Sequence, residues 1–391
     1  MFYVREEIIV CVLDYKYESY NTYSEIFVDF RSIHDLRMFQ EYTDLRFDGG
    51  SIICIRNYSS RKRLIRNGYY ALNVQDFKEI ESENNQEESF VLAYTFDIQH
   101  KDINIFLKHG PLAELEENPN ILGSLEDLDF GSEILYSLCV YDVEQANYNE
   151  IRDSSDRPIL IYDMGTPLHS SRAYVRNVIE QHINSIKKNS PVFVLSHWDI
   201  DHYQCLVGMT DDEICSFSSF FFVNKTKSLT SQRTIERILK LMPRKTSVFE
   251  VPSKTYKSKY PYTHNILSFS NLDLFIGENS RNINYAGLML VVKTTNTKAL
   301  LSGDCCMSQA NDILNQYSNI DGCRTIMVVP HHGGKFSTNY NHFQTIGNLA
   351  IISVGQNNYG HPSKQTLNLL RNYFPYIRRT DKEGDIVEVL K

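Results

Sequence analysis

The sequence predicts an α/β fold, and two features indicate it. Along residues 131–391, short apolar segments typical of buried strands alternate with segments of helical periodicity. Several of these apolar segments run directly into His or Asp side chains, which is typical of a sheet with a functional site at its strand ends. Residues 1–130 carry a separate group of strand-like segments. We therefore expect an N-terminal α+β accessory domain over residues 1–130 and an α/β domain over residues 131–391.

The first domain is expected to contain short strands and a helix. The strands cover residues 8–13, 25–30, 51–55 and 90–96, and the helix covers residues 32–43. Residues 76–88 are polar and acidic, which is typical of an exposed loop. Residues 110–131 contain Pro111, Pro119, Gly123 and several acids, so we place the domain boundary near residue 130.

The second domain is expected to alternate strands with helices. The strands cover residues 134–141, 158–162, 191–195, 287–293, 298–301, 325–329 and 350–354. The helices cover residues 171–187, 307–317 and 366–374, and residues 231–241 fit an amphipathic helix. In the first of these helices, Val175, Val178, Ile179, His182 and Ile183 recur on one face, which predicts a buried stripe.

Composition excludes several classes of protein. The chain has 391 residues, 42% of them hydrophobic and 23% charged, so a disordered or low-complexity chain is excluded. A net charge of −8 argues against a basic nucleic-acid coat. Eight cysteines without a C-x-x-C motif indicate buried thiols in a reducing compartment and not a disulfide framework. With neither a signal peptide nor an apolar run of about 18 residues, we expect a soluble cytoplasmic protein without a membrane anchor.

The segment from His197 to His202 carries the strongest chemical signal. It contains His197, Asp199, Asp201 and His202 directly after the strand at residues 191–195. Imidazole and carboxylate groups together suit Zn, Mn or Fe. Two divalent ions about 3.5–4 Å apart can activate water and polarise a substrate oxygen. The alternative is a surface loop rich in polar residues.

Three later segments repeat the order of strand and then ligand. Asp304 follows residues 298–301, His331 and His332 follow residues 325–329, and His361 lies in the loop after residues 350–354. Each has a structural alternative: Asp304 as a helix N-cap, His331 and His332 as ordinary core or surface histidines, and His361 as a turn residue before a proline. All these segments together, in this order, favour a metal site.

These motifs resemble those of the metallo-β-lactamase superfamily, and within it the hydrolase domain of the ComEC-type competence proteins and their stand-alone relatives. The matching motifs are H-x-D-x-D-H at 197–202, L-x-G-D at 301–304, P-H-H-G at 330–333 and G-H-P at 360–362. Residues 161–165 resemble the early strand-Asp-x-Gly, and residues 141–145 resemble the opening D-V-G-Q-G. The resemblance covers about residues 131–391 and implies a four-layer αββα sandwich with two central sheets.

The chain departs from the pattern of the superfamily in three places. Glu144 and Ala146 replace the glycines of the opening motif, and Asp199 replaces the second His of the main motif. The middle His before Asp304 has no clear counterpart, since His264 is the only His of that interval and its context is not persuasive. Harder oxygen ligands make Mn²⁺ a competitor of Zn²⁺.

The resemblance implies a role for each matching residue. Metal one would be held by His197 and Asp199, metal two by Asp201 and His202, with Asp304 bridging and either His331 or His332 completing the set. A metal-bridging hydroxide would be the nucleophile, and Asp163 would orient the main loop through hydrogen bonds. His361 would donate a proton to the leaving group. Lys335 and Ser337 are candidates to contact a substrate phosphate.

The implied activity is that of a phosphodiesterase or nuclease acting on nucleic acid or nucleotides. Residues 225–259 hold ten Lys and Arg against two Glu, which fits a phosphate backbone or, alternatively, a solvated lysine-rich surface. Two other functions stay open: a metallo-hydrolase of another bond, such as a thioester, lactone or peptide-like bond, and an inactive binding module that keeps the fold. Residues 1–130 match no known family and are candidates to cap the site, bind a protein partner or form a homo-oligomer.

Overall fold

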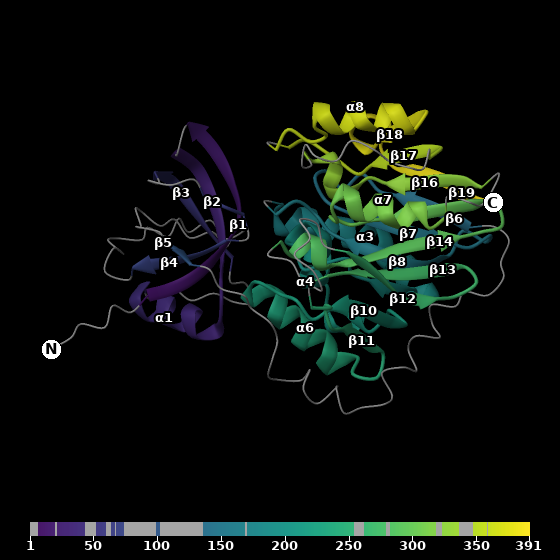
Figure 1. Cartoon of the computed structure of the whole chain (residues 1–391). Coiled ribbons are helices and arrows are strands. Elements are labelled where there is room, and N and C mark those ends of the chain that lie inside the picture. The colour runs from purple at the N-terminus through teal and green to yellow at the C-terminus, as the bar shows by residue number, and fades with distance from the viewer. Residues whose placement is uncertain are drawn as a thin grey trace. The chain divides into compact units, whose positions relative to one another are not determined.

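The computed structural model divides the chain into two compact units. One unit contains residues 1–106 and 226–237, and the other contains residues 107–225 and 238–391. The structure describes residues 7–19, 22–43, 52–59, 64–66, 68–73, 99–101, 136–168, 170–253, 262–278, 282–317, 323–335, 347–357 and 359–391. Figure 1 shows the described elements of both units. The boundary predicted near residue 130 lies outside the described residues and stays a prediction.

The N-terminal unit is built on an antiparallel sheet. Its strands, in the order β3-β2-β1-β4-β5, are β1 (Glu7–Ser19), β2 (Thr22–Phe30), β3 (Ile52–Ser59), β4 (Tyr69–Asn73) and β5 (Gln99–Lys101). Alternate residues of β1, such as Val10 and Val12, join Phe39 of helix α1 (Ile33–Thr43) in one buried cluster. Residues 226–237 complete this unit, because Asp29 accepts a hydrogen bond from the backbone N of Thr230 at 2.9 Å.

The second unit contains two seven-stranded sheets. The first has the order β11-β10-β9-β8-β7-β6-β19, and the second has the order β12-β13-β14-β15-β16-β17-β18. The strands of the first sheet are β6 (Tyr136–Val140), β7 (Tyr148–Arg152), β8 (Pro158–Met164), β9 (Val192–Val194), β10 (Ser219–Val223), β11 (Thr246–Phe249) and β19 (Ile386–Leu390). Those of the second are β12 (Thr263–Ser268), β13 (Leu272–Gly277), β14 (Leu288–Lys293), β15 (Thr297–Leu301), β16 (Arg324–Val328), β17 (Leu349–Ile352) and β18 (Tyr376–Arg379).

Helices cover the two sheets of the second unit. Its α-helices are α3 (Arg172–Asn189), α4 (Ile200–Gly208), α5 (Asp211–Ile214), α7 (Met307–Asn315), α8 (Lys364–Tyr373) and α9 (Thr380–Glu383), and its 3-10 helices are η3 (Ile283–Ala286) and η4 (Pro330–Gly333). Helix α6 (Leu229–Leu241) is divided, since its residues up to 237 belong to the N-terminal unit and its residues from 238 to the second unit. Helices α3 and α4 contact β8 of the first sheet. Helices α7 and α8 share a buried cluster with strands of the second sheet. The order of helices, sheet, sheet and helices confirms the predicted αββα sandwich (Figure 1).

Each sheet contains a parallel half, and these halves position the site. Strands β8, β9, β10 and β11 are parallel neighbours, as are β15, β16, β17 and β18. The carboxyl ends of parallel neighbours lie at one edge of a sheet, where ligands of α/β proteins usually bind. The two sheets are joined at this edge, since the Tyr162 hydroxyl of β8 donates to the carbonyl of Leu288 in β14 at 2.8 Å.

Helix α3 shows how the sequence pattern produces these layers. Its buried residues include the predicted Val175, Val178, Ile179 and Ile183, so the apolar stripe faces the first sheet. Ser171 caps its first turn by accepting a hydrogen bond from the backbone N of Tyr174. The helix ends at Ser190, which adopts a left-handed backbone conformation with φ 47°.

Most predicted elements are found with small shifts at their ends, and several further elements were missed. The predicted strand at residues 90–96 and the acidic loop at residues 76–88 lie outside the described residues. The missed elements are β4, β5, β7, β10, β11, β12, β13, β18, β19, α4, α5, α9, η3 and η4. The cysteines with described side chains, at positions 11, 139, 205, 215, 305, 306 and 323, are free thiols, as expected. Their predicted burial is wrong for Cys215, which is exposed, and for Cys306 and Cys323, which are half-buried. No helix in the described part of the chain is long and apolar enough to cross a membrane.

Candidate metal site

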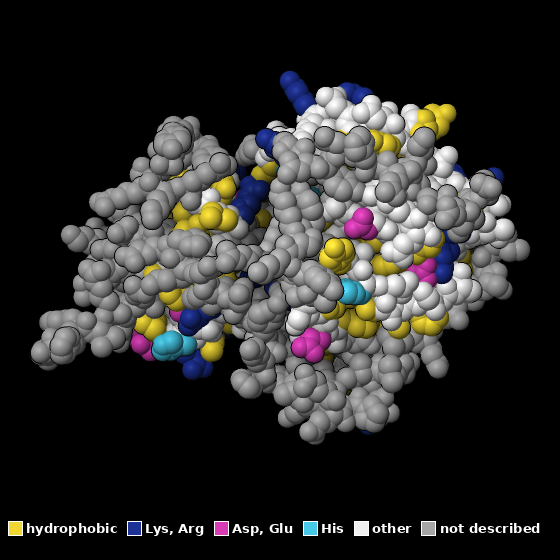
Figure 2. All heavy atoms as spheres, in the orientation of Figure 1, with side chains coloured by type: hydrophobic (Ala, Val, Ile, Leu, Met, Phe, Trp, Pro, Cys, Tyr) yellow, Lys and Arg dark blue, Asp and Glu magenta, His cyan; other side chains and the backbone are white. Residues whose placement is uncertain are grey.

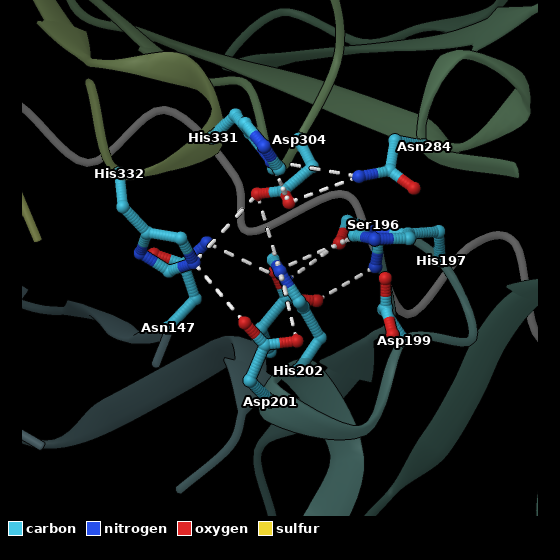
Figure 3. A network of polar contacts seen from close by, with 12 residues as sticks. Asn147, Ser196, His197, Asp199, Asp201, His202, Asn284, Asp304, His331 and His332 are labelled. Atoms are coloured by element: carbon cyan, nitrogen blue, oxygen red, sulfur yellow. Dashed lines mark hydrogen bonds and ion pairs between the residues drawn. The ribbon is translucent and has the colours of Figure 1, made fainter. Parts of the chain in front are cut away.

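The candidate site is assembled from loops that follow strands of both sheets. Asp163 lies near the end of β8, and Ser196 and His197 follow β9. Asp304 follows β15, and η4 carries His331 and His332 after β16. Most of these side chains are buried: His197 and His202 are 0% exposed, His332 is 2% exposed and Asp304 is 4% exposed. The site is therefore a buried cluster of imidazole and carboxylate groups (Figure 3).

The main motif continues directly into a helix. Asp199 is the N-cap of α4, and its side chain accepts a hydrogen bond from the backbone N of Ile200 at 3.2 Å. Asp201 and His202 consequently lie in the first helical turn. Gly165 allows this turn to approach β8, because a Cβ at Gly165 would lie 1.7 Å from the carbonyl oxygen of Asp201. A side chain at Gly165 would displace the start of α4 and the two ligand candidates with it.

Two groups of potential ligand atoms lie close together. His197, His202 and Asp304 form one group, and Asp201, His202 and His332 form the other, with the ligand atoms of each group within 4.8 Å of one another. Nε2 of His202 lies 3.2 Å from Oδ1 of Asp304, and Nε2 of His332 lies 3.3 Å from Oδ2 of Asp201. Each group offers two imidazoles and one carboxylate, which are the ligand types of catalytic zinc sites.

Outer hydrogen bonds orient the three buried imidazoles in the same way. His202 Nδ1 donates to Asp163 at 2.8 Å, and His332 Nδ1 donates to the carbonyl of Ser353 at 2.8 Å. His197 Nδ1 lies 3.0 Å from the Ser196 hydroxyl, which itself donates to Asp163 at 2.8 Å. Each ring therefore uses Nδ1 on the outer side and turns Nε2 toward the cluster. Such outer partners typically fix the orientation of metal-binding histidines.

The inner atoms of the cluster are buried without hydrogen bonds. Nε2 of His197, His202 and His332 and Oδ1 of Asp304 have no hydrogen-bond partner among the described residues. Buried polar atoms are rarely left unsatisfied, and each costs about 1–3 kcal/mol. Cations bound between these nitrogen and oxygen atoms would satisfy all of them. The residues present thus fit the divalent metal ions that the sequence predicts.

The electrostatics of the cluster also favour positive charge. Burial opposes a charged imidazole at His202, but the carboxylates of Asp304, Asp163 and Asp201 outweigh it and hold the pKa of His202 well above its ordinary value. Burial raises the pKa of Asp304, but the charges and hydrogen bonds of His331 and His202 outweigh burial. The pKa of Asp304 is therefore well below its ordinary value. Burial, followed by repulsion from His202, lowers the pKa of His197 to about 3, so its imidazole is neutral and able to bind a metal ion.

The structure distinguishes His331 from His332, which the sequence could not. His332 belongs to the second ligand group, whereas His331 contacts the outer oxygen of Asp304, Oδ2, through Nδ1. The side chain of His331 is 43% exposed. Both residues adopt left-handed backbone conformations with φ 52°, which is uncommon for a non-glycine residue and typical of functional sites.

The remaining predicted site residues lie in different places. Asp199 belongs to neither ligand group among the described residues, although it lies beside the cluster in Figure 3. The ring of His361 packs against that of His331, with centroids 5.2 Å apart. Lys335 is exposed, and Ser337 lies outside the described residues. His264, on strand β12, pairs with Glu278, which follows β13, and it belongs to neither ligand group.

Asp304 is not the helix cap that the alternative interpretation required, because the N-cap of α7 is Cys306.

Four residues around the ligands were missed by the sequence reasoning: Ser196, Asn147, Asn284 and Gln145. Asn284 Nδ2 donates to Oδ2 of Asp304 at 3.1 Å, and Asn147 Nδ2 lies 3.4 Å from His202 Nδ1. Ser196 and Asn147 lie next to recognised motifs and Gln145 lies within one, which was the only signal in the sequence, whereas Asn284 lies near none of them.

Comparisons with known proteins agree with the resemblance seen in the motifs. No protein-family model matches the chain. A segment of 105 residues is 34% identical to ComE operon protein 3 of Bacillus subtilis (strain 168), and it covers 26% of this chain and 13% of that protein. The chain therefore matches only a small part of this relative.

Two solved structures are also similar, at low identity. The metal-dependent hydrolase Tm1679 of the beta-lactamase superfamily is 12% identical, with 66% of this chain and 98% of that chain covered and a TM-score of 0.35. Zn(2+)-bound PqqB from Methylobacterium extorquens is 9% identical, with 63% of this chain and 87% of that chain covered and a TM-score of 0.34. The predicted resemblance to the metallo-β-lactamase superfamily, and to ComEC-type proteins within it, is confirmed by the match to ComE operon protein 3 and by the observed αββα fold.

Proposed function

We propose that the chain is a metal-dependent hydrolase that cleaves phosphoester bonds, in nucleic acid or in nucleotides. One observation carries the proposal. Three buried imidazoles have Nδ1 bound on the outer side, while their Nε2 atoms face the carboxylates of Asp201 and Asp304 without hydrogen bonds. A purely structural polar cluster would pair these atoms with one another. The arrangement is typical of a site that holds two divalent cations.

Each residue of the candidate site would have a distinct role in binding the two ions. His202 belongs to both groups, but only its Nε2 faces the cluster, and this nitrogen can bind one ion. His197, His202 and Asp304 would hold one ion, and Asp201 and His332 would hold the second. Asp304 Oδ1 lies 3.2 Å from His202 Nε2 and 3.9 Å from His332 Nε2, which places it between the two groups. Two divalent ions, Zn²⁺ or Mn²⁺, would supply an activated water molecule and polarise a phosphate oxygen. Asp163 would keep His202 and Ser196 in their orientations.

His361 would act on the substrate, not on the metal ions. Its ring lies next to His331 and outside both ligand groups, so it is available to the leaving-group oxygen of a bound ester. Lys335 is exposed and follows η4, which carries His331 and His332. It would contact a phosphate of the substrate.

The proposed substrate class is inferred mainly from the resemblance to ComEC-type proteins and less from the basic residues on the protein surface. Lys225, the first residue of the basic stretch, is 4% exposed, whereas Lys240, Arg244 and Lys245 are exposed. Residues 254–259 of this stretch lie outside the described residues. Figure 2 shows Lys and Arg side chains at several separate places on the described surface of one face. The net charge of −8 favours short oligonucleotides or nucleotides over a long duplex.

The test is metal-dependent hydrolysis of a panel of phosphodiesters. The full chain is stripped of metal, reloaded with Mn²⁺ or Zn²⁺, and assayed on a chromogenic diester, single- and double-stranded DNA, and RNA. We expect turnover that requires metal and falls by at least about 10³-fold in Asp201→Ala/His202→Ala. Two bound ions without cleavage of any diester would redirect the proposal to another hydrolysable bond. A chain that binds no metal would refute it and leave a binding module.

A further inference from the structure

The first and last motifs of the second unit lie against each other, although more than 200 residues separate them. The Ser353 hydroxyl donates to the carbonyl of Ala146 at 2.8 Å. A Cβ at Gly355 would lie 2.2 Å from Cα of Glu144, so the two backbones are in direct contact. Glu144 itself has φ 59°, the left-handed region that favours glycine, at a position where relatives carry glycine. This contact places Gln145 beside the loop that carries His361.

Gln145 reaches the ring of His361. Its side chain is 4% exposed, and its Nε2 lies 3.3 Å from Nδ1 of His361. An amide nitrogen only donates, so Nδ1 must be the accepting nitrogen of the imidazole in this arrangement. The proton of a neutral ring then lies on Nε2. Gln145 therefore selects the Nε2–H tautomer of His361.

Asn357 holds the backbone of the same loop. Its Oδ1 accepts hydrogen bonds from the backbone N of Tyr359 at 3.1 Å and of His361 at 3.0 Å. Its Nδ2 donates to the carbonyls of Gly355 at 2.9 Å and of His361 at 2.9 Å. One side chain thus fixes both the amide and the carbonyl of His361. Such a set of bonds serves the position of His361 and has no evident use in packing.

The other nitrogen of His361 faces the metal-site loop. A Cβ at Gly334 would lie 2.8 Å from Nε2 of His361 and 2.6 Å from Cδ2 of His331. Gly334 follows η4, which carries His332 of the second ligand group. The absence of a side chain at Gly334 therefore lets Nε2 of His361 approach the loop of the ligands. This nitrogen is the one that bears the proton when Gln145 donates to Nδ1.

We propose that Gln145 is a positioning residue that orients His361 so that its Nε2–H donates a hydrogen bond to the leaving-group oxygen of the substrate. The inference rests on the proposed function, since it gives His361 a substrate to contact. It adds a role for the glutamine of the opening motif, which the metal site does not use. It also explains why a loop from the start of the fold packs against a loop near its end.

The experiment compares Gln145→Met, which keeps the side-chain length but cannot donate, with Gln145→Glu, which accepts where glutamine donates. Gln316→Met, on an exposed glutamine just after α7, is the matched control. Nitrogen-15 spectra of the imidazole of His361, assigned with His361→Ala, report which ring nitrogen carries the proton. Turnover of the chromogenic diester is measured on the same metal-loaded samples, as kcat and KM separately.

We expect the wild-type ring in the Nε2–H form, and Gln145→Glu with the proton on Nδ1. Both Gln145 variants should lose about 10- to 100-fold in kcat with little change in KM, because a misplaced donor mainly affects the transition state. The control should match the wild type. A wild-type ring protonated on Nδ1, or a Gln145→Met protein with an unchanged ring spectrum and unchanged kcat, would overturn the inference. If the wild type cleaves no diester, the proposed function fails, and the ring spectra alone decide whether Gln145 sets the tautomer.

Discussion

Two buried clusters of histidine and carboxylate lie in the second unit, and they differ in how their atoms are paired. The first is the candidate metal site. The second surrounds Glu150 on β7, where Oε1 accepts from the Tyr148 hydroxyl at 2.7 Å and Oε2 accepts from the Tyr141 hydroxyl at 2.9 Å. Arg152 Nε also donates to Oε2 at 2.9 Å, and His182 Nδ1 lies 3.3 Å from Oε1. Every carboxylate oxygen in this second cluster has donors.

The comparison shows that pairing, and not burial, separates the two roles. Glu150 and His202 are equally hidden from solvent, at 1% and 0% exposed. Around Glu150 the described side chains satisfy one another, as expected of a network that stabilises a fold. In the candidate metal site the inner atoms of three histidines and one aspartate make no hydrogen bonds among the described residues, and His202 and His332 only face Asp304 and Asp201 at ion-pair distances of 3.2 and 3.3 Å. Unpaired atoms that converge from separate loops therefore mark a place for a ligand, whereas a complete network marks a structural support.

The largest expected effect comes from a substitution that removes a metal ligand and leaves the fold intact. Asp201→Asn keeps the shape of the side chain but removes a ligand charge. Wild-type protein in a thousand-fold excess of metal over the Kd should gain about 4 kcal/mol in its free energy of unfolding, and the variant should lose most of this gain. Urea unfolding with and without Mn²⁺ or Zn²⁺ measures this gain in the free energy of unfolding for both proteins.

The control for this variant is Asp212→Asn, an exposed aspartate in the first turn of α5. It should keep the metal-induced stabilisation of the wild type. The metal-free Asp201→Asn protein should unfold within about 1 kcal/mol of the metal-free wild type, because Asp201 is partly exposed. A large loss of stability in the metal-free variant would mean that the metal site, like the Glu150 cluster, supports the fold.

The second effect concerns the acid stability that Glu150 provides. Burial raises its pKa, but the hydrogen bonds and charges of His182, Tyr148 and Arg152 outweigh burial and lower the pKa to about 2. A carboxyl with a lowered folded pKa stabilises the fold above its unfolded pKa of about 4.5, and this contribution is lost as the pH falls toward 2. We expect a loss of about 3 kcal/mol across this window, measured by urea unfolding at several pH values.

Glu150→Gln tests whether Glu150 is the source of that pH dependence. The variant should be less stable than wild type at pH 7 and should show a flatter stability profile between about pH 4.5 and 2. Its metal stoichiometry should be unchanged, because Glu150 touches none of the ligand candidates. Glu250→Gln, at an exposed position, should behave as wild type. A Glu150→Gln profile as steep as that of the wild type would assign the acid sensitivity to other carboxyls.

The sequence predicts the architecture well where the elements are strongly periodic. The apolar stripe of α3 and the apolar runs of β9, β14, β15 and β16 were recognised because burial on one or both faces leaves a clear pattern. Strand β12 and strand β18 are largely half-exposed and were missed, since a half-buried edge strand has a weak pattern. Strand β10 was missed although its five residues are all buried.

Site residues that belong to a sequence motif could be predicted. Residues that reach the site only because separate loops meet in the folded chain were harder to predict. His197, Asp201, His202, Asp304 and His332 were identified from motifs, and the structure brings them into two groups. The choice of His332 over His331 depends on two left-handed backbone residues, which no pattern in one sequence reveals. The partners of these ligands, Ser196 and Asn284, are small polar residues whose use depends on which loops meet. Asp199, prominent in the motif, caps α4 and joins neither group.

The smallest expected effect concerns Asn284, whose side chain donates a hydrogen bond to Asp304. Figure 3 shows its amide nitrogen pointing to Asp304, and this nitrogen and His331 share the outer oxygen of that carboxylate. The inner oxygen stays directed at His202. Asn284 therefore supports the ligand geometry from outside, and its own Oδ1 has no hydrogen-bond partner in the described part of the chain.

Replacing Asn284 should weaken metal binding without abolishing it. Loss of an outer partner typically costs about 10- to 100-fold in metal affinity, so Asn284→Ala should raise the Kd by that factor while two ions still bind at saturation. Calorimetric titration of the stripped protein measures both quantities, and Asn368→Ala, on the exposed face of α8, is the matched control. If Asn284→Ala binds one ion fewer, Asn284 is itself a ligand and replaces the missing histidine directly. If the Kd is unchanged, His331 alone is enough to hold Asp304 in place.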